Sequence, residues 1–193
     1  IVDNTGNILH TEDGGTTWVP QDSGTDQYLG SVYFLNSEEG WATGMRQIFH
    51  TQDGGATWAV SDPDISLHPA MAVFRDIHFV DRHSGWIATD IMLSSDSAAY
   101  ETGAPLLHTT DGGKTWSVQA WLPDWSLSGI VMTSKVTGWA PGFRSILQTT
   151  DGGESWSSQL DGRDAPFVDI SSADQSHPWV LSFDGKVYHY ETH

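Results

Sequence analysis

Four aspartates recur in one short sequence pattern and are the first candidates for chemistry in this chain. Asp13, Asp53, Asp111 and Asp151 each begin the pattern D-G-G-x-[ST]-W. A pair of carboxylates roughly 5 to 10 Å apart could cleave a glycosidic bond, one as the acid and the other as base or nucleophile. An aspartate can instead accept hydrogen bonds from the backbone that follows it and close a turn. We favour the turn, because two glycines follow each aspartate and accept positive φ at little steric cost.

Other residues with catalytic or ligand-binding potential form no recognisable constellation. His10, His50 and His108 occupy equivalent places before three of the aspartates. Equivalent places in separate repeats are too far apart to share a metal, so these histidines are expected to pack between repeats. Arg75 is expected to be structural. The sequence contains no H-E-x-x-H, G-x-S-x-G, P-loop or dinucleotide motif, so we expect no metal and no cofactor.

A repeat of about 40 residues must position these turns. The four aspartates are 40, 58 and 40 residues apart, and a Gly-Trp pair precedes three of them, at Trp41, Trp86 and Trp139. The longer spacing is a 40-residue unit with two loop expansions, the larger of them at roughly 92–105. A period near 40 with several short strands in each unit predicts a propeller or a solenoid.

Each unit reads as four short antiparallel strands. "LGSVYFLN", "GWATG", "QIFHTQ" and "ATWAVS" are rich in β-branched and aromatic residues and are separated by turn-forming residues. The D-G-G turn joins the third and fourth strands. Trp41, Trp86, Trp139 and Trp179 recur in register, and we expect all four in the blade core.

The repeated pattern is similar to the Asp-box, also called the bacterial neuraminidase repeat. Together with "FRDIHFVDRHSGWIATD" and "SVYFLNSEEGWATGMRQIFHTQDGGATW", it resembles the photosystem II stability and assembly factor family. The resemblance implies an all-β propeller of four-stranded antiparallel blades, seven-bladed in those factors, that holds a partner protein without catalysis. Asp-boxes also occur in glycosidases, so the pattern reports fold rather than function. The Arg-rich patch of the assembly factors is not expected here, because the five arginines are scattered among 25 acidic residues.

The repeat divides the chain into about five blades or part-blades. The expected units are approximately 1–24, 25–64, 65–123, 124–163 and 164–193 of one propeller domain, with the first strand missing from the first unit and the last strand from the fifth. We expect an arc of a larger propeller or an irregularly closed ring of five. The residues assigned to the structural turns are Asp13, Gly15, Trp18, Asp53, Gly55, Trp58, Asp111, Gly113, Trp116, Asp151, Gly153 and Trp156.

Three aromatic residues outside the repeated pattern are the candidate binding residues. Trp121 and Trp125 lie on the link between two units, and Tyr100 lies in the inserted loop. They either cap a blade edge or form an exposed aromatic surface for a protein or a sugar. Loops on a rigid scaffold often carry function, so the insertion at 92–105 is the first candidate for a binding element.

Composition restricts the partners. The net charge of −17 repels nucleic acid, and no apolar run is long enough for membrane insertion. Acidity and the absence of cysteine favour an extracellular, periplasmic or envelope location. Two hypotheses follow: a non-catalytic scaffold for protein partners in a larger assembly, or a glycosidase or carbohydrate-binding propeller fragment. We favour the scaffold; an enzyme on this fold would be a glycoside hydrolase.

Overall fold

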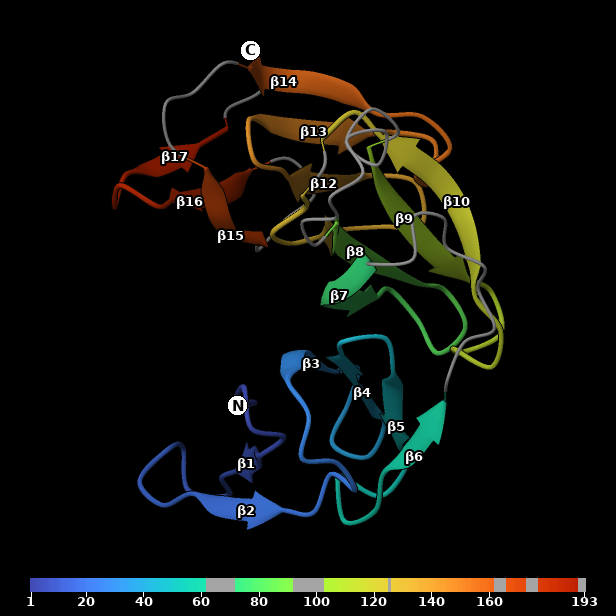
Figure 1. Cartoon of the computed structure of the whole chain (residues 1–193), viewed down its shortest axis with the longest axis vertical. Coiled ribbons are helices and arrows are strands. Elements are labelled where there is room, and N and C mark those ends of the chain that lie inside the picture. Colours follow the sequence, from blue (N-terminus) through green and yellow to red (C-terminus); the bar gives the residue numbers. More distant parts are fainter. Residues whose placement is uncertain (62–71, 92–102, 125, 162–165, 173–176, 191–193) are drawn as a thin grey trace.

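The protein is built of β-strands throughout its described parts. The computed structural model describes residues 1–61, 72–91, 103–124, 126–161, 166–172 and 177–190. These residues contain no helix, and therefore none that could cross a membrane. The strands form separate antiparallel sheets side by side in an arc (Figure 1). The predicted all-β propeller architecture is confirmed.

Seventeen strands make up the described sheets. They are β1 (Ile8–His10), β2 (Val19–Gln21), β3 (Leu29–Phe34), β4 (Gly40–Gly44), β5 (Ile48–Thr51), β6 (Ala59–Ser61), β7 (Ala72–Phe79), β8 (Gly85–Ile91), β9 (Ala104–Thr109), β10 (Ser117–Leu122), β11 (Val131–Met132), β12 (Gly138–Pro141), β13 (Ser145–Thr149), β14 (Ser157–Asp161), β15 (Phe167–Ser172), β16 (Pro178–Ser182) and β17 (Val187–His189).

The sheets follow the sequence order without crossovers. Blade 1 is β1–β2, blade 2 is β3–β6, blade 3 is β7–β10, blade 4 is β11–β14 and blade 5 is β15–β17. In Figure 1, the first strands of blades 2 and 3, β3 and β7, lie on the inside of the arc, and their fourth strands, β6 and β10, lie on the outside. Blades 1 and 5 form its two ends, on either side of an opening.

Every residue of the central strands β4 and β8 is buried. Since alternate side chains of a strand point to opposite faces, both faces of these blades are covered. The hydrophobic clusters lie between neighbouring blades. Trp41 and Ile48 of blade 2, for example, pack against Phe74, Leu107 and Trp116 of blade 3. Equivalent clusters join blades 1 and 2, 3 and 4, and 4 and 5. Blades 2, 3 and 4 therefore depend on their neighbours for the burial of both faces.

Two of the Gly-Trp tryptophans, Trp41 and Trp86, connect their blade to the turn of the next blade. The indole of Trp41 stacks on Phe79 of blade 3 with ring centroids 3.7 Å apart. Its Nε1 donates a hydrogen bond of 3.2 Å to the carbonyl of Gly112, the first glycine of the D-G-G turn of blade 3. Trp86 donates in the same way to Gly152 at 3.2 Å. The polar edge of each indole is thus satisfied inside an otherwise apolar interface.

One of the four predicted core tryptophans is not buried. Trp41, Trp86 and Trp139 are at most 1% exposed, whereas Trp179 is 52% exposed. The prediction of a core position for Trp179 was wrong. Trp179 occupies the same place in blade 5 as the others do in their blades, but it lies on the outer face of the last described blade. Its burial would need a neighbouring blade on that face.

We predict that the bond to the glycine carbonyl contributes measurably to stability. Trp41→Phe should lower the free energy of unfolding by about 1 to 2 kcal/mol more than Trp139→Phe. Both indoles are completely buried, but Trp139 Nε1 has no hydrogen-bond partner among the described residues. Trp139→Phe is therefore the matched control for the loss of ring volume. Urea denaturation of both variants measures the difference, and equal losses would contradict the role of the bond.

Candidate functional site

The predicted Asp-box residues form compact hydrogen-bonded turns. In blade 2, Asp53 Oδ1 accepts hydrogen bonds from Thr51 Oγ1 at 2.8 Å and from the Thr57 backbone N–H at 2.9 Å. Thr51 Oγ1 in turn accepts the Gly55 N–H at 2.8 Å. Gly54 and Gly55 both have positive φ, +71° and +89°, which explains the glycine pair. The carboxylate is therefore occupied in holding the turn closed.

The other three turns repeat this geometry. Asp13, Asp111 and Asp151 accept hydrogen bonds from the hydroxyl two residues before them and from the backbone N–H four residues after them. The hydroxyl four residues after each aspartate donates to its second oxygen, and this bond together with the others lowers the pKa of Asp13, Asp53 and Asp151 to about 2. The pKa of Asp111 is also about 2, because its hydrogen bonds outweigh the raising effect of desolvation. These carboxylates stay ionised at neutral pH, so they are poor proton donors.

Two of the three histidines before the turns each stack on the Gly-Trp indole of their own blade. His50 stacks on Trp41 with ring centroids 4.9 Å apart, and His108 stacks on Trp86 at 4.6 Å. Burial lowers the pKa of both imidazoles, which favours their neutral form. No group of three or more His, Cys, Asp or Glu side chains that could hold a metal occurs among the described residues.

The three aromatic residues predicted to bind a partner are not shown to form a common surface. Trp121, on β10, is 43% exposed. Tyr100 and Trp125 lie outside the described residues, as does most of the inserted loop at 92–105. The structure therefore describes only the exposed indole of Trp121.

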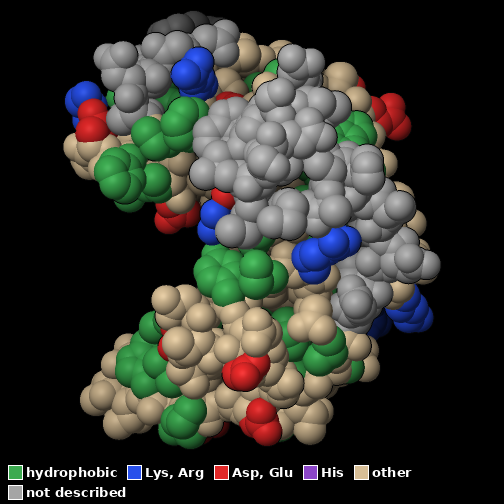
Figure 2. Space-filling model, viewed as in Figure 1, with side chains coloured by type: hydrophobic (Ala, Val, Ile, Leu, Met, Phe, Trp, Pro, Cys, Tyr) green, Lys and Arg blue, Asp and Glu red, His purple; other side chains and the backbone are tan. Residues whose placement is uncertain are grey.

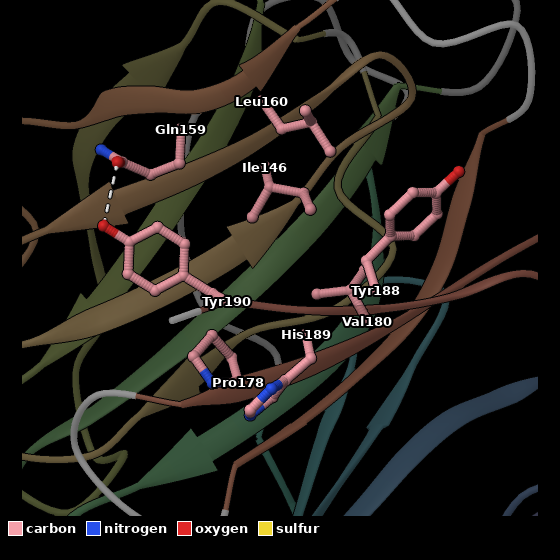
Figure 3. Close-up of a pocket in the computed structure, with 8 residues that line it drawn as sticks. All are labelled: Ile146, Gln159, Leu160, Pro178, Val180, Tyr188, His189 and Tyr190. Atoms are coloured by element: carbon pink, nitrogen blue, oxygen red, sulfur yellow. Dashed lines mark hydrogen bonds between the residues drawn. The ribbon is translucent and has the colours of Figure 1, made fainter. Parts of the chain in front are cut away.

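An apolar pocket of about 230 Å³ lies between blades 4 and 5 (Figure 3). Its lining consists of four aliphatic residues, two tyrosines and two polar side chains. The residues are Ile146, Gln159, Leu160, Pro178, Val180, Tyr188, His189 and Tyr190. At one side, the Tyr190 hydroxyl lies 3.5 Å from Gln159 Oε1, at the limit of a hydrogen bond. The pocket thus combines a mostly apolar wall with a few polar groups, as ligand sites do.

The repeat explains why this pocket is apolar. Ile146 is equivalent to Ile48 of blade 2, five residues before the turn aspartate. Ile48 belongs to the cluster that contains Trp116, the Asp-box tryptophan of the following blade. In blades 3 and 4, Ala120 and the Asp-box tryptophan Trp156 pack against the same hydrophobic cluster. Leu160 of blade 4 is equivalent to Ala120 of blade 3 in the repeat. The pocket walls are therefore the surfaces that elsewhere surround an Asp-box indole.

Sequence reasoning missed this pocket because its walls come from two blades. The register of the repeat carries the signal that could have found it. In blades 2 and 3, certain residues contact the Asp-box of the next blade, and their equivalents in blade 4 line the pocket. In blade 5 the corresponding turn position falls at residues 191–193, outside the described part.

A second, polar pocket of about 450 Å³ lies between blades 2 and 3. Glu39 is its central charge, with His50 Nε2 at 3.6 Å and Arg82 Nη2 at 3.7 Å from its two oxygens. Lys114 and Asp111 also line it. Both signs of charge therefore line this pocket, and Glu39 is paired with two of its cationic neighbours.

Two further ionisable groups join the inner strands. Arg75 pairs with Asp90 and donates to the Tyr28 hydroxyl at 3.2 Å, so its guanidinium is occupied within the fold. Asp76 accepts hydrogen bonds from Ser31 Oγ at 2.7 Å and from the Ile130 N–H at 2.9 Å. Burial raises the pKa of Asp76, and the charge of Asp169 adds to the increase. The pKa of Asp76 is therefore raised toward the range in which a carboxyl group can donate a proton near neutral pH.

Two family models match parts of the sequence. The model described as photosynthesis system II assembly factor YCF48 matches residues 1–72, and the BNR/Asp-box repeat matches residues 107–118. Both agree with the predicted resemblance. A search of curated proteins finds no match.

Solved structures share the fold at low sequence identity. YCF48 from Cyanidioschyzon merolae is 16% identical, with a TM-score of 0.68, and the match covers 98% of this chain and 65% of that one. The Niastella koreensis GH74 enzyme is 14% identical, with a TM-score of 0.69, over 97% of this chain and 33% of that one. The chain therefore spans less than two thirds of either protein. At these identities the likeness establishes the propeller fold alone.

We predict that the Asp-box turns make the protein sensitive to acid. A carboxylate with its pKa lowered from 3.8 to about 2 stabilises the fold above the unfolded-state pKa. That contribution disappears as the pH falls through about 2. The melting temperature should therefore fall between about pH 4 and pH 2.

Asp53→Asn tests this origin of the acid sensitivity. The variant should melt at a lower temperature at neutral pH, because Thr57 loses a carboxylate acceptor, and its melting temperature should depend less on pH. Glu154→Gln removes one charge from an exposed side chain beside another turn and is the control. Scanning calorimetry across this pH range measures both effects. An Asp53→Asn profile that coincides with that of Glu154→Gln would be evidence against the turn as the origin.

Proposed function

We propose that this protein is a non-catalytic propeller scaffold that binds a partner protein within a larger assembly. The apolar pocket between blades 4 and 5 is the observation that carries the proposal, because its walls are chemically matched to an aromatic or large aliphatic side chain. The match of residues 1–72 to an assembly-factor family supports the same role. The ionised turn aspartates also favour a structural use of the repeated acids.

In this proposal, the pocket binds one apolar side chain of an extended segment of the partner protein. Ile146, Leu160 and Val180 provide the apolar contact area. Gln159 and Tyr190 provide hydrogen-bonding groups beside the partner backbone. A single well-filled pocket with a polar edge is typical of the anchor position of a protein interface.

A peptide selection tests the proposal. A random peptide library displayed on phage is selected against the wild-type protein, and the recovered peptides should contain Trp, Phe or Leu at a fixed place. Their affinity should fall at least tenfold in Leu160→Trp, whose larger side chain fills the pocket. Val60→Trp is the matched control, since Val60 lies on β6, is 48% exposed and is remote from the pocket in the fold. Failure to recover peptides, or equal affinity in the two variants, would refute this site.

A second candidate function is glycoside hydrolysis or carbohydrate binding. The raised pKa of Asp76 near Asp169 favours it, because a glycosidase needs one protonated acid beside a second carboxylate. The exposed indole of Trp121 would suit a sugar ring. Hydrolysis of aryl glycosides or sialosides by the wild type, abolished in both Asp76→Asn and Asp169→Asn, would establish this function in place of the scaffold.

We also propose an extracellular, periplasmic or cell-envelope location. The strongly acidic composition and the absence of cysteine support it. Fractionation of cells that produce the native protein tests it, and recovery from the cytoplasmic fraction alone would argue against it.

A further inference from the structure

The position three residues after the Asp-box tryptophan is a glutamine in three blades and a serine in one. The glutamines are Gln21, Gln119 and Gln159, and the serine is Ser61 of blade 2. All four lie on the last strand of their blade, β2, β10, β14 or β6. Blade 2 therefore departs from the repeat at this position, where it carries a much shorter residue.

Two of these glutamines bind the Asp-box turn of the following blade. Gln21 Nε2 donates a hydrogen bond of 3.3 Å to the Gly54 carbonyl, and Gln119 Nε2 donates one of 3.1 Å to the Gly152 carbonyl. The Gln119 Oε1 also accepts the indole N–H of Trp86 at 3.0 Å. At these junctions a primary carboxamide thus lies beside the first glycine of the turn and donates to its carbonyl.

The junction between blades 2 and 3 has no such carboxamide among the described residues. A methyl group added at Gly55 or Gly153, the second glycines of their turns, would meet the glutamine carboxamide, but at Gly113 it would first meet two indoles. Gly112 and Gly113 instead line the polar pocket of about 450 Å³. The pocket therefore borders the turn where a glutamine lies at the two other junctions.

The rest of the lining brings charges of both signs to this turn. Lys and Arg side chains are few and scattered on the face shown in Figure 2, and Arg82 and Lys114 bring two of the eight basic residues of the chain to this one pocket. Glu39 lies 3.6 Å from His50 and 3.7 Å from Arg82. Both distances are longer than hydrogen bonds, so the carboxylate retains acceptor sites for a further donor.

We propose that this polar pocket binds a free amino acid with a carboxamide side chain, and that L-glutamine is its best match. The ligand carboxamide donates to the Gly112 carbonyl, as the glutamines of the repeat do to their own turns. The α-carboxylate of the ligand pairs with Arg82 or Lys114, and its α-ammonium group pairs with Glu39. L-Glutamate is disfavoured, because its side-chain carboxylate has no N–H to donate and would face a carbonyl oxygen.

Titration of the full ¹⁵N-labelled chain with L-glutamine, followed by NMR, is the test. L-Glutamine should shift the amide signals of Gly112 and Gly113 in a saturable way. L-Glutamate has nearly the same size but lacks the donor, so it should bind at least about tenfold more weakly. L-Glutamine without a saturable shift at these glycines, or equal affinity for the two amino acids, would overturn the proposal.

A neutral analogue distinguishes a free amino acid from a glutamine side chain of a protein. N-acetyl-L-glutamine amide keeps the carboxamide and lacks both α-charges, so it should bind more weakly than L-glutamine. Glu39→Gln should weaken the binding of L-glutamine and leave that of the neutral analogue unchanged. If the analogue binds as tightly as L-glutamine, the ligand is a glutamine side chain of a protein and the proposal of a free amino acid is wrong.

The repeat itself provides the variant that should close the pocket. Ser61→Gln restores the glutamine of the other blades and should abolish the binding of L-glutamine, because its own carboxamide takes the ligand's place. Ser117→Gln introduces the same side chain at an exposed position of β10 outside the pocket and should bind like wild type. Circular dichroism checks that both variants fold. A folded Ser61→Gln variant with wild-type affinity would also contradict the proposal.

Discussion

The contact between a Gly-Trp indole and the Asp-box turn of the next blade is the interaction on which this architecture depends. A blade has two apolar faces and no interior of its own, so it is stable only when neighbours cover it. Trp41 satisfies this requirement with a completely buried ring and a hydrogen bond to the Gly112 carbonyl. The Asp-box therefore closes its own hairpin and also accepts a hydrogen bond from the preceding blade, and these two roles together couple the blades.

The same requirement accounts for the apolar surfaces that stay accessible in the described parts of the molecule. Where a blade lacks a neighbour, its apolar face is exposed, as at Trp179 and Trp18. Between blades 4 and 5, Ile146 and Leu160 surround a pocket rather than an Asp-box ring among the described residues. The exposed face and the pocket both arise from the apolar face that every blade repeats. A neighbouring blade covers this face completely at some junctions, partly at the pocket, and not at all where it is exposed. These accessible apolar surfaces arise from the arrangement of the blades rather than from a dedicated motif.

The sequence predicts the local features well and the relations between blades poorly. The D-G-G turns, the four-strand units and the propeller class follow from short-range patterns, because turn chemistry and strand alternation are written in neighbouring residues. The register of Trp179 matches that of Trp41 and predicts a core position, but burial depends on whether another blade covers that face. The apolar pocket was missed for a similar reason, since Ile146 and Tyr188 belong to different blades.

The electrostatics of the acidic residues bear on the choice between scaffold and enzyme. An acid catalyst must be protonated at working pH, whereas the turn hydrogen bonds lower the pKa of Asp53 and Asp151. The pKa of Asp76 is raised instead, but its carboxylate oxygens already accept hydrogen bonds from Ser31 and from the Ile130 N–H. Its carboxylate bridges blades 2, 3 and 4, and release for catalysis would loosen all three. A structural role for these acids therefore agrees better with their hydrogen bonds than catalysis does. Burial of the apolar blade faces is then the main source of free energy for association with another molecule.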